Sequence, residues 1–157
     1  MENELKIYVD ADACPKVIKE HLYKVVRRLE IDMVLVADQS FQIPQSPHIS
    51  FLTVPSGIDA ADEKIVDLVN SGDVVITADI PLADQVVSKG AYAINPRGEL
   101  YTEQNIKERL AIRDMMAEMR SSGLEFGGPP SFNSKDKQTF ANQLDKLLTK
   151  LTRSSIA

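Results

Sequence analysis

The chain has 157 residues, of which 43% are hydrophobic and 26% charged, and its formal net charge at pH 7 is -5. These values suit one globular domain, and no apolar run reaches the ~18 residues of a membrane-spanning helix. The negative charge argues against a generally basic nucleic-acid-binding surface. The first residues lack a signal-peptide pattern, and a single cysteine excludes an internal disulfide. We therefore expect a cytoplasmic protein without a membrane anchor.

Short β-branched runs alternate with amphipathic segments over the first hundred residues. Strands are expected at residues 7–9, 32–37, 49–54, 73–77 and 91–94. Helices are expected at residues 16–30, 60–71, 81–89, 103–121 and 135–151. This alternation predicts a three-layer α/β/α sandwich with a mainly parallel sheet. We expect one domain, with residues 1–101 as its α/β core and residues 102–157 as a helical extension.

Cap and breaker residues set the expected boundaries. Asp59 is placed to cap a helix, with Asp62 at the third helical position as in a capping box, and Gly72 is expected to end that helix. Thr102 is a candidate cap for the next long helix. The segment NPRGELYT, which ends at Thr102, is predicted to be a turn. The GGPPSF segment is predicted to be a loop that covers a pocket or mediates assembly.

Acidic residues follow the strands at positions that a parallel sheet brings to one edge. Asp10 and Asp12 close the first strand, and Asp79 follows the fourth. Asp62 and its neighbours Asp59 and Glu63 begin the helix between the third and fourth strands. The carboxyl ends of parallel strands form the usual ligand edge of an α/β sheet. Clustered carboxylates without a His/Cys set favour Mg²⁺ or Mn²⁺, which would offset their repulsion and could activate water at a phosphodiester.

Some of these residues also have purely structural interpretations. Asp59, Asp62 and Asp79 could act only as helix caps, and Asp84 could be a solvated helix residue. Cys14 is more easily explained as a small buried side chain than as a reactive thiol.

Two other features bear on ligand binding. His48 has no evident partner in the sequence, and Arg97 could contact a phosphate or lie on the surface. No Lys/Arg run with interleaved aromatics of the kind that tracks RNA is visible.

Five motifs taken together resemble the YaiI/YqxD family of uncharacterised bacterial proteins over nearly the whole chain. They are VDADACP, DAADEKIVD, GDVVITADIPLA, NPRGELYT and GGPPSF, in that order. That family is similar to PIN-like domains, many of which are metal-dependent ribonucleases. The resemblance implies an acidic pocket in which Asp10, then Asp59 or Asp62 with Glu63, then Asp79 follow the PIN pattern, with Asp84 as a possible fourth acid.

These observations lead to one main hypothesis and two alternatives. The main one is a divalent-metal-dependent phosphodiesterase acting on RNA, in which Asp10 and Asp79 hold Mg²⁺ or Mn²⁺ with Asp62 and Asp84 as further metal ligands. Asp12, Asp59 and Glu63 would complete the site or position water. The first alternative is a haloacid dehalogenase-like phosphatase with Asp10 as nucleophile and Asp12 as general acid. The second is a non-catalytic nucleic-acid or metal-binding module.

Overall fold

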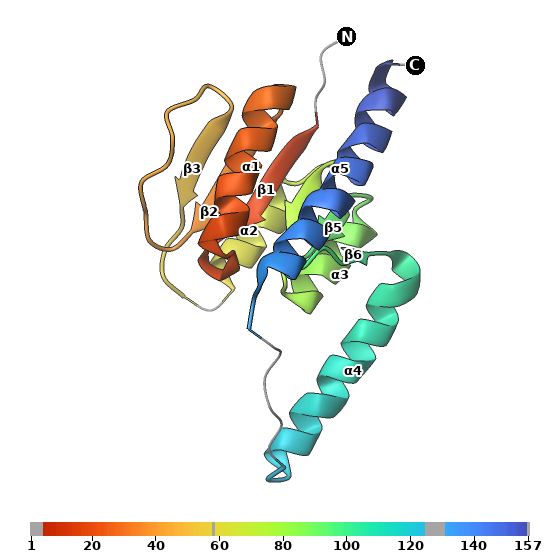
Figure 1. The fold of residues 1–157 in the computed structure, drawn as a ribbon. Coiled ribbons are helices and arrows are strands. Elements are labelled where there is room, and N and C mark those ends of the chain that lie inside the picture. Colours follow the sequence, from red (N-terminus) through yellow and green to blue (C-terminus); the bar gives the residue numbers. More distant parts are fainter. Residues whose placement is uncertain (1–4, 58, 125–130, 157) are drawn as a thin grey trace.

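A computed structural model describes residues 5–57, 59–124 and 131–156 and has a six-stranded sheet at its centre (Figure 1). The strand order is β3-β2-β1-β4-β5-β6, with β1 to β5 parallel and β6 antiparallel to β5. The strands are β1 (Lys6–Asp10), β2 (Asp32–Ala37), β3 (Ile49–Thr53), β4 (Val74–Ile76), β5 (Tyr92–Ile94) and β6 (Leu100–Tyr101). The helices are η1 (Ala11–Ala13), α1 (Lys16–Leu29), α2 (Ala60–Leu68), α3 (Ile80–Ser88), α4 (Glu103–Ser121) and α5 (Ser134–Ile156).

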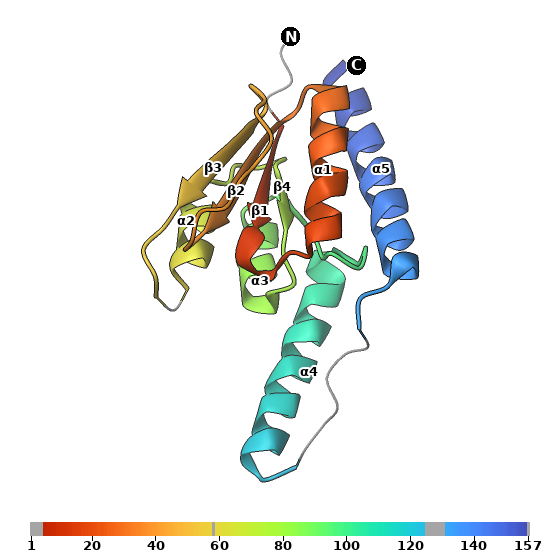
Figure 2. The same cartoon turned by 60° about the vertical axis from the view of Figure 1, so that its left-hand side comes forward.

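The alternation of side chains along the strands builds two cores, one on each face of the sheet. Ile7 and Val9 of β1 pack in the core that includes α1 and α5, whereas Tyr8 packs in the core that includes α2 and α3. Figure 2 shows α1 and α5 side by side on one side of the sheet, with α2 and α3 on the other. The predicted α/β/α sandwich with a mainly parallel sheet is therefore confirmed.

The two C-terminal helices have different relations to this sandwich. Phe140, Leu144 and Leu148 of α5 are fully buried against the α1 face, so α5 is part of a core layer. Of the described residues of α4, Ile106 alone is buried, and the helix projects beyond the sandwich (Figures 1 and 2). No helix in the described ranges has the length and apolarity to cross a membrane.

Two local predictions were wrong. Asp59 takes the N-cap position of α2 as predicted, but its backbone is left-handed (φ 64, ψ 11) and its side chain makes no capping hydrogen bond, so the expected capping box with Asp62 is absent. The helix ends at Leu68 and not near Gly72, because Val69 leaves the helix in an extended conformation and is buried in the core.

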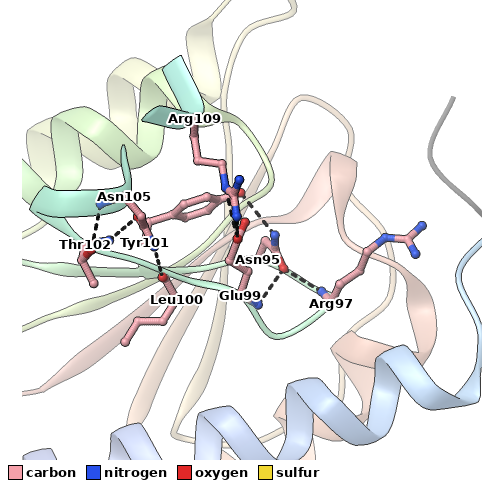
Figure 3. Close-up of polar contacts among 8 residues, drawn as sticks. All are labelled: Asn95, Arg97, Glu99, Leu100, Tyr101, Thr102, Asn105 and Arg109. Carbon is pink, nitrogen blue, oxygen red and sulfur yellow. Dashed lines mark hydrogen bonds and ion pairs between the residues drawn. The ribbon is translucent and has the colours of Figure 1, made fainter. Parts of the chain in front are cut away.

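The segment NPRGELYT contains strand β6 and is more than the predicted turn. Asn95 organises it: its Oδ1 accepts the backbone N–H groups of Arg97 (2.9 Å) and Glu99 (3.0 Å), and its Nδ2 donates to the Tyr101 hydroxyl (3.2 Å) (Figure 3). These bonds close a tight connection that returns the chain beside β5. A sequence pattern read by periodicity does not find a strand of only two residues.

The same segment fixes the start of α4. Thr102 caps the helix as predicted, with a reciprocal capping box in which the Thr102 hydroxyl accepts the Asn105 N–H (3.1 Å) and Asn105 Oδ1 accepts the Thr102 N–H (2.8 Å). Asn105 Nδ2 also donates to the Leu100 carbonyl at 2.9 Å, and Arg109 forms an ion pair with Glu99 (Figure 3). The first two turns of α4 are thereby held to β6.

Candidate functional site

Asp10 lies at the carboxyl end of the central strand β1 and is only 8% exposed. Its Oδ2 accepts a hydrogen bond from the buried hydroxyl of Thr77, which follows β4, at 3.0 Å. Burial raises the pKa of Asp10, the Thr77 bond lowers it, and the charges of Asp79 and Asp12 raise it again. The pKa is raised on balance, so Asp10 is a buried acid surrounded by other acids.

Thr77 also connects Asp10 to Asp79. The Thr77 oxygen accepts the backbone N–H of Asp79 at 3.0 Å, so one hydroxyl joins the ends of β1 and β4. Asp79 caps α3 as expected, with its Oδ1 accepting the N–H of Leu82 at 2.9 Å. The cap interpretation of Asp79 is confirmed, and it leaves the side chain in electrostatic contact with Asp10.

Asp62, in the first turn of α2, is the acid whose ionisation is most affected by its neighbours. Burial, then the charges of Asp79, Asp10 and Asp59, and then a hydrogen bond to Asp79, raise the pKa of Asp62 to about 7. Burial is the largest of these causes, and the charges of three neighbouring acids add to it, so acidic groups are concentrated around Asp62. Of the three middle acids in the prediction, Asp62 is thus the one coupled to both strand-end acids.

A cavity of about 230 Å³ adjoins these acids. Residues from α2, α3 and α4 line it; they are Asp59, Asp62, Glu63, Asp79, Pro81, Leu82, Gln85 and Arg113. Asp59 and Glu63 are exposed at its wall. Arg113, on the projecting helix α4, brings a positive charge to a cavity whose lining includes four acidic side chains.

Two predicted site residues are directed elsewhere. Asp12 Oδ2 accepts the backbone N–H of Asp38 at 3.1 Å, which ties η1 to the segment after β2. Asp84 of α3 forms an ion pair with Lys107 of α4 at 3.5 Å and is not among the residues that line the cavity. The structure therefore brings Asp10, Asp62 and Asp79 together, with Asp59 and Glu63 at the adjoining cavity wall. The charge of Asp12 still raises the pKa of Asp10, and Asp84 is not brought to the cluster.

The donor set suits a hard divalent cation in its chemistry, because every candidate donor is a carboxylate oxygen. Within the described ranges, however, no group of three or more His, Cys, Asp or Glu side chains lies close enough to hold a metal ion as the side chains stand. The acids are close enough to perturb each other's ionisation and too far apart to form a ready coordination shell.

The remaining expectations concern residues outside the acidic cluster. Cys14 is buried and its pKa is raised to about 12, mainly by burial, which agrees with a structural side chain. His48 does have a partner, since its Nδ1 lies 3.1 Å from Asp32 at the neighbouring strand start. Arg97 pairs with Asp136 of α5 at 2.8 Å. Most of the GGPPSF loop lies outside the described residues.

Two residues of this region were missed in the sequence. Thr77 carries a recognisable signal, because it is a polar residue directly after a buried apolar strand and two positions before Asp79. Arg113 carries none, because its place at the cavity depends on the direction in which α4 leaves β6.

The chain is thus an α/β/α sandwich protein with a mainly parallel sheet. A buried carboxyl stands at the end of its central strand, and further acids surround it. The chain belongs to the family described as "Uncharacterized BCR, YaiI/YqxD family", whose model matches residues 8–150. No solved structure was found to match the chain.

Curated relatives carry the name "UPF0178 protein". One from Syntrophotalea carbinolica is 58% identical over 146 residues, covering 93% of this chain and 99% of that protein. Others from Maridesulfovibrio salexigens and Shewanella pealeana are 58% and 56% identical, and each comparison covers 93% of this chain and 97% of the relative. These names assign no activity, so function has to be argued from the residues.

Proposed function

We propose that this protein is a PIN-like, divalent-metal-dependent phosphodiesterase that acts on RNA in the cytoplasm. The observation that carries the proposal is the gathering of Asp10, Asp62 and Asp79 at the carboxyl edge of the sheet, where the pKa of Asp62 is raised to about 7 by burial and by the other acids. Such a concentration of negative charge stabilises a bound cation and is costly without one.

The side chains would have distinct roles. Asp10 and Asp79 would hold Mg²⁺ or Mn²⁺, and Asp62 would join them on losing its proton. The ion supplies an activated water and stabilises charge on the phosphodiester. Thr77 is a positioning residue, since its hydroxyl donates to Asp10 and favours the ionised form that a cation needs. Arg113 lines the cavity and offers a guanidinium for a phosphate oxygen.

Titration calorimetry with MnCl₂ and cleavage of a labelled single-stranded RNA test the proposal. We expect the parent protein to bind Mn²⁺ and cleave, and Asp10→Asn to lose both while keeping its fold. Asp67→Asn is the matched control, because Asp67 is an exposed acid of α2 that does not line the cavity. If Asp10→Asn bound Mn²⁺ as tightly as the parent, the metal site would be wrong.

The phosphatase alternative makes Asp10 a nucleophile and so predicts a covalent phospho-aspartate. Acid quenching during turnover of a ³²P-labelled phosphomonoester separates the two mechanisms. Radiolabel held covalently by the parent protein and absent from Asp10→Asn would replace the present proposal, whereas attack by metal-activated water forms no phosphorylated protein.

A further inference from the structure

A second concave surface, larger than the acidic cavity, runs along α1. Its volume is about 890 Å³, and it lies between α1 and the segment that joins β2 to β3. The residues that line it are Lys16, Lys19, Glu20, Tyr23, Lys24, Arg27, Phe41, Gln42, Ile43 and Pro44. We call this surface the α1 groove.

The α1 groove is basic although the chain as a whole is acidic. Four of its lining residues are cationic, and Glu20 is the one carboxylate among them, against a net charge of -5 for the chain. The cations are three, five and three residues apart, from Lys16 through Lys19 and Lys24 to Arg27, and all four line the groove, so they form a broad stripe along α1. The stripe spans about 17 Å at ~1.5 Å per residue.

An aromatic ring stands opposite this stripe. Phe41 is half-buried, and the Lys19 Nζ lies 4.2 Å from the centre of its ring. Phe51 of β3 supports Phe41 in an edge-to-face contact, with ring centres 4.7 Å apart. Cations along a groove with a supported aromatic ring are the combination that binds single-stranded nucleic acids, because phosphates pair with the cations and a base stacks on the ring.

The α1 groove begins at the same sheet edge as the acidic cluster. Its helical wall starts at Lys16, six residues after Asp10, and its other wall starts at Phe41, four residues after β2 ends. The hydrogen bond from the Asp38 N–H to Asp12, at 3.1 Å, joins the two segments that lead into these walls. Figure 1 shows that α1 begins at the carboxyl edge of the sheet, so a nucleic-acid strand lying along α1 would have one end there.

We propose that the α1 groove binds single-stranded nucleic acid, with its phosphates on Lys16, Lys19, Lys24 and Arg27 and a base on Phe41. Binding in the groove stands apart from catalysis; it rests on the proposed function only in that the bound strand would be the substrate delivered to Asp10. An acidic protein segment is the less fitting ligand, because it would use the cations and offer no flat ring to stack on Phe41.

Fluorescence anisotropy with a fluorescein-labelled 12-nucleotide oligouridylate tests the groove, in EDTA so that no metal-dependent cleavage occurs. Each phosphate contact contributes a slope of about 0.7 in log affinity against log salt, so four contacts predict a slope of about -2.8. Lys19→Gln/Lys24→Gln should reduce that slope by about 1.4 and weaken binding at least tenfold at low salt. Phe41→Leu should weaken binding about fivefold or more and leave the slope unchanged, because stacking releases no counterions.

The matched control is Lys135→Gln/Lys146→Gln on α5, which removes the same charge from exposed residues outside the α1 groove. An equal loss in this control, or no loss in Lys19→Gln/Lys24→Gln, would overturn the proposal. Equal competition by polyglutamate of the same charge would overturn it in favour of an acidic protein ligand.

Cleavage assays with Mn²⁺ separate this proposal from the proposed function. RNA binding that depends on the groove, without cleavage, supports nucleic-acid binding by the α1 groove and rules out the proposed phosphodiesterase activity. Cleavage that the groove substitutions leave unchanged in KM and rate supports the phosphodiesterase and removes the groove.

Discussion

Replacing Asp62 with Asn should stabilise the protein at pH 8 when no divalent cation is present. The pKa of Asp62 is raised from 3.8 to about 7 in the folded state, first by burial and then by Asp79, Asp10 and Asp59. A raised carboxyl pKa means that the folded state holds the proton more tightly than the unfolded state. The stability that this proton provides is fully present below pH 3.8 and is lost as the pH rises toward 7. Above pH 7 the ionised carboxylate carries a constant penalty.

The size of the effect follows from the shift. About three pKa units at ~1.4 kcal/mol each would give roughly 4 kcal/mol for a fully shielded group. Asp62 is only half-buried at the cavity wall, so solvent screening reduces the expected penalty to about 1–2 kcal/mol. Asn keeps the shape of the side chain, cannot ionise, and can still donate a hydrogen bond to Asp79.

Urea denaturation in EDTA at pH 5 and at pH 8 measures this penalty. The free energy of unfolding of Asp62→Asn should exceed that of the parent by about 1–2 kcal/mol at pH 8, and by clearly less at pH 5. Asp67→Asn, on the same helix and exposed, should show no such pH-dependent gain. If Asp62→Asn were no more stable than the parent at pH 8, the idea that an ionised Asp62 destabilises the folded state would be refuted.

The cation supplies a second arm of this experiment. Under the proposed function, Mn²⁺ should raise the denaturation midpoint of the parent at pH 8, because a ligand that binds only the folded state stabilises it. The gain should be smaller in Asp62→Asn, which lacks the third carboxylate. An equal gain in both proteins would remove Asp62 from the metal shell.

Three further outcomes test the fold around the site. Gly98→Ala should lower the urea midpoint more than Gly72→Ala. Both glycines have φ near +90, but a Cβ at Gly98 would lie 2.8 Å from the Thr139 backbone, whereas a Cβ at Gly72 would have no neighbouring atom within 4 Å. Equal losses of stability in the two variants would contradict this packing. Cys14, whose pKa is raised to about 12, should resist a maleimide at pH 8 until the protein unfolds, and rapid labelling of the native protein would show the thiol to be accessible. Thr102→Ala should cost about 1 kcal/mol in unfolding free energy and Thr102→Ser much less, since Ser preserves the cap; equal costs would mean that the hydroxyl is not responsible.

The layered architecture could be predicted because local pattern and global packing agree in this chain. Apolar runs of β-formers became parallel strands, and the spacing of Phe140, Leu144 and Leu148 correctly indicated a helix with a buried face. The sequence could not show which face of the sheet α5 would cover, because helical spacing alone does not identify the packing partner. The His48–Asp32 pair was missed for a related reason, since it depends on β2 and β3 starting side by side.

The acidic cluster was predictable in outline because strand ends of a parallel sheet share one edge. Its details were not. Asp59 was expected to cap α2, yet its left-handed backbone places it at the cavity wall without a cap bond. Asp12 was expected to lie on the same side as Asp10, and its charge does raise the pKa of Asp10, but its Oδ2 accepts the Asp38 N–H. In both cases the backbone conformation just after a strand or loop decides the direction of the carboxylate, and periodicity does not report that conformation.

The net charge averages over regions that the fold separates, so it says nothing about a local groove. The carboxylates converge from β1, α2 and the start of α3, while the cations of α1 form a stripe along the groove. Since Phe41 comes from the segment after β2, no continuous stretch of sequence contains both the cations and the ring, and the search for a basic run with interleaved aromatics could not find them. An acidic chain can thus present a basic groove, and here that groove starts at the same sheet edge as the acids to which a bound strand would have to be delivered.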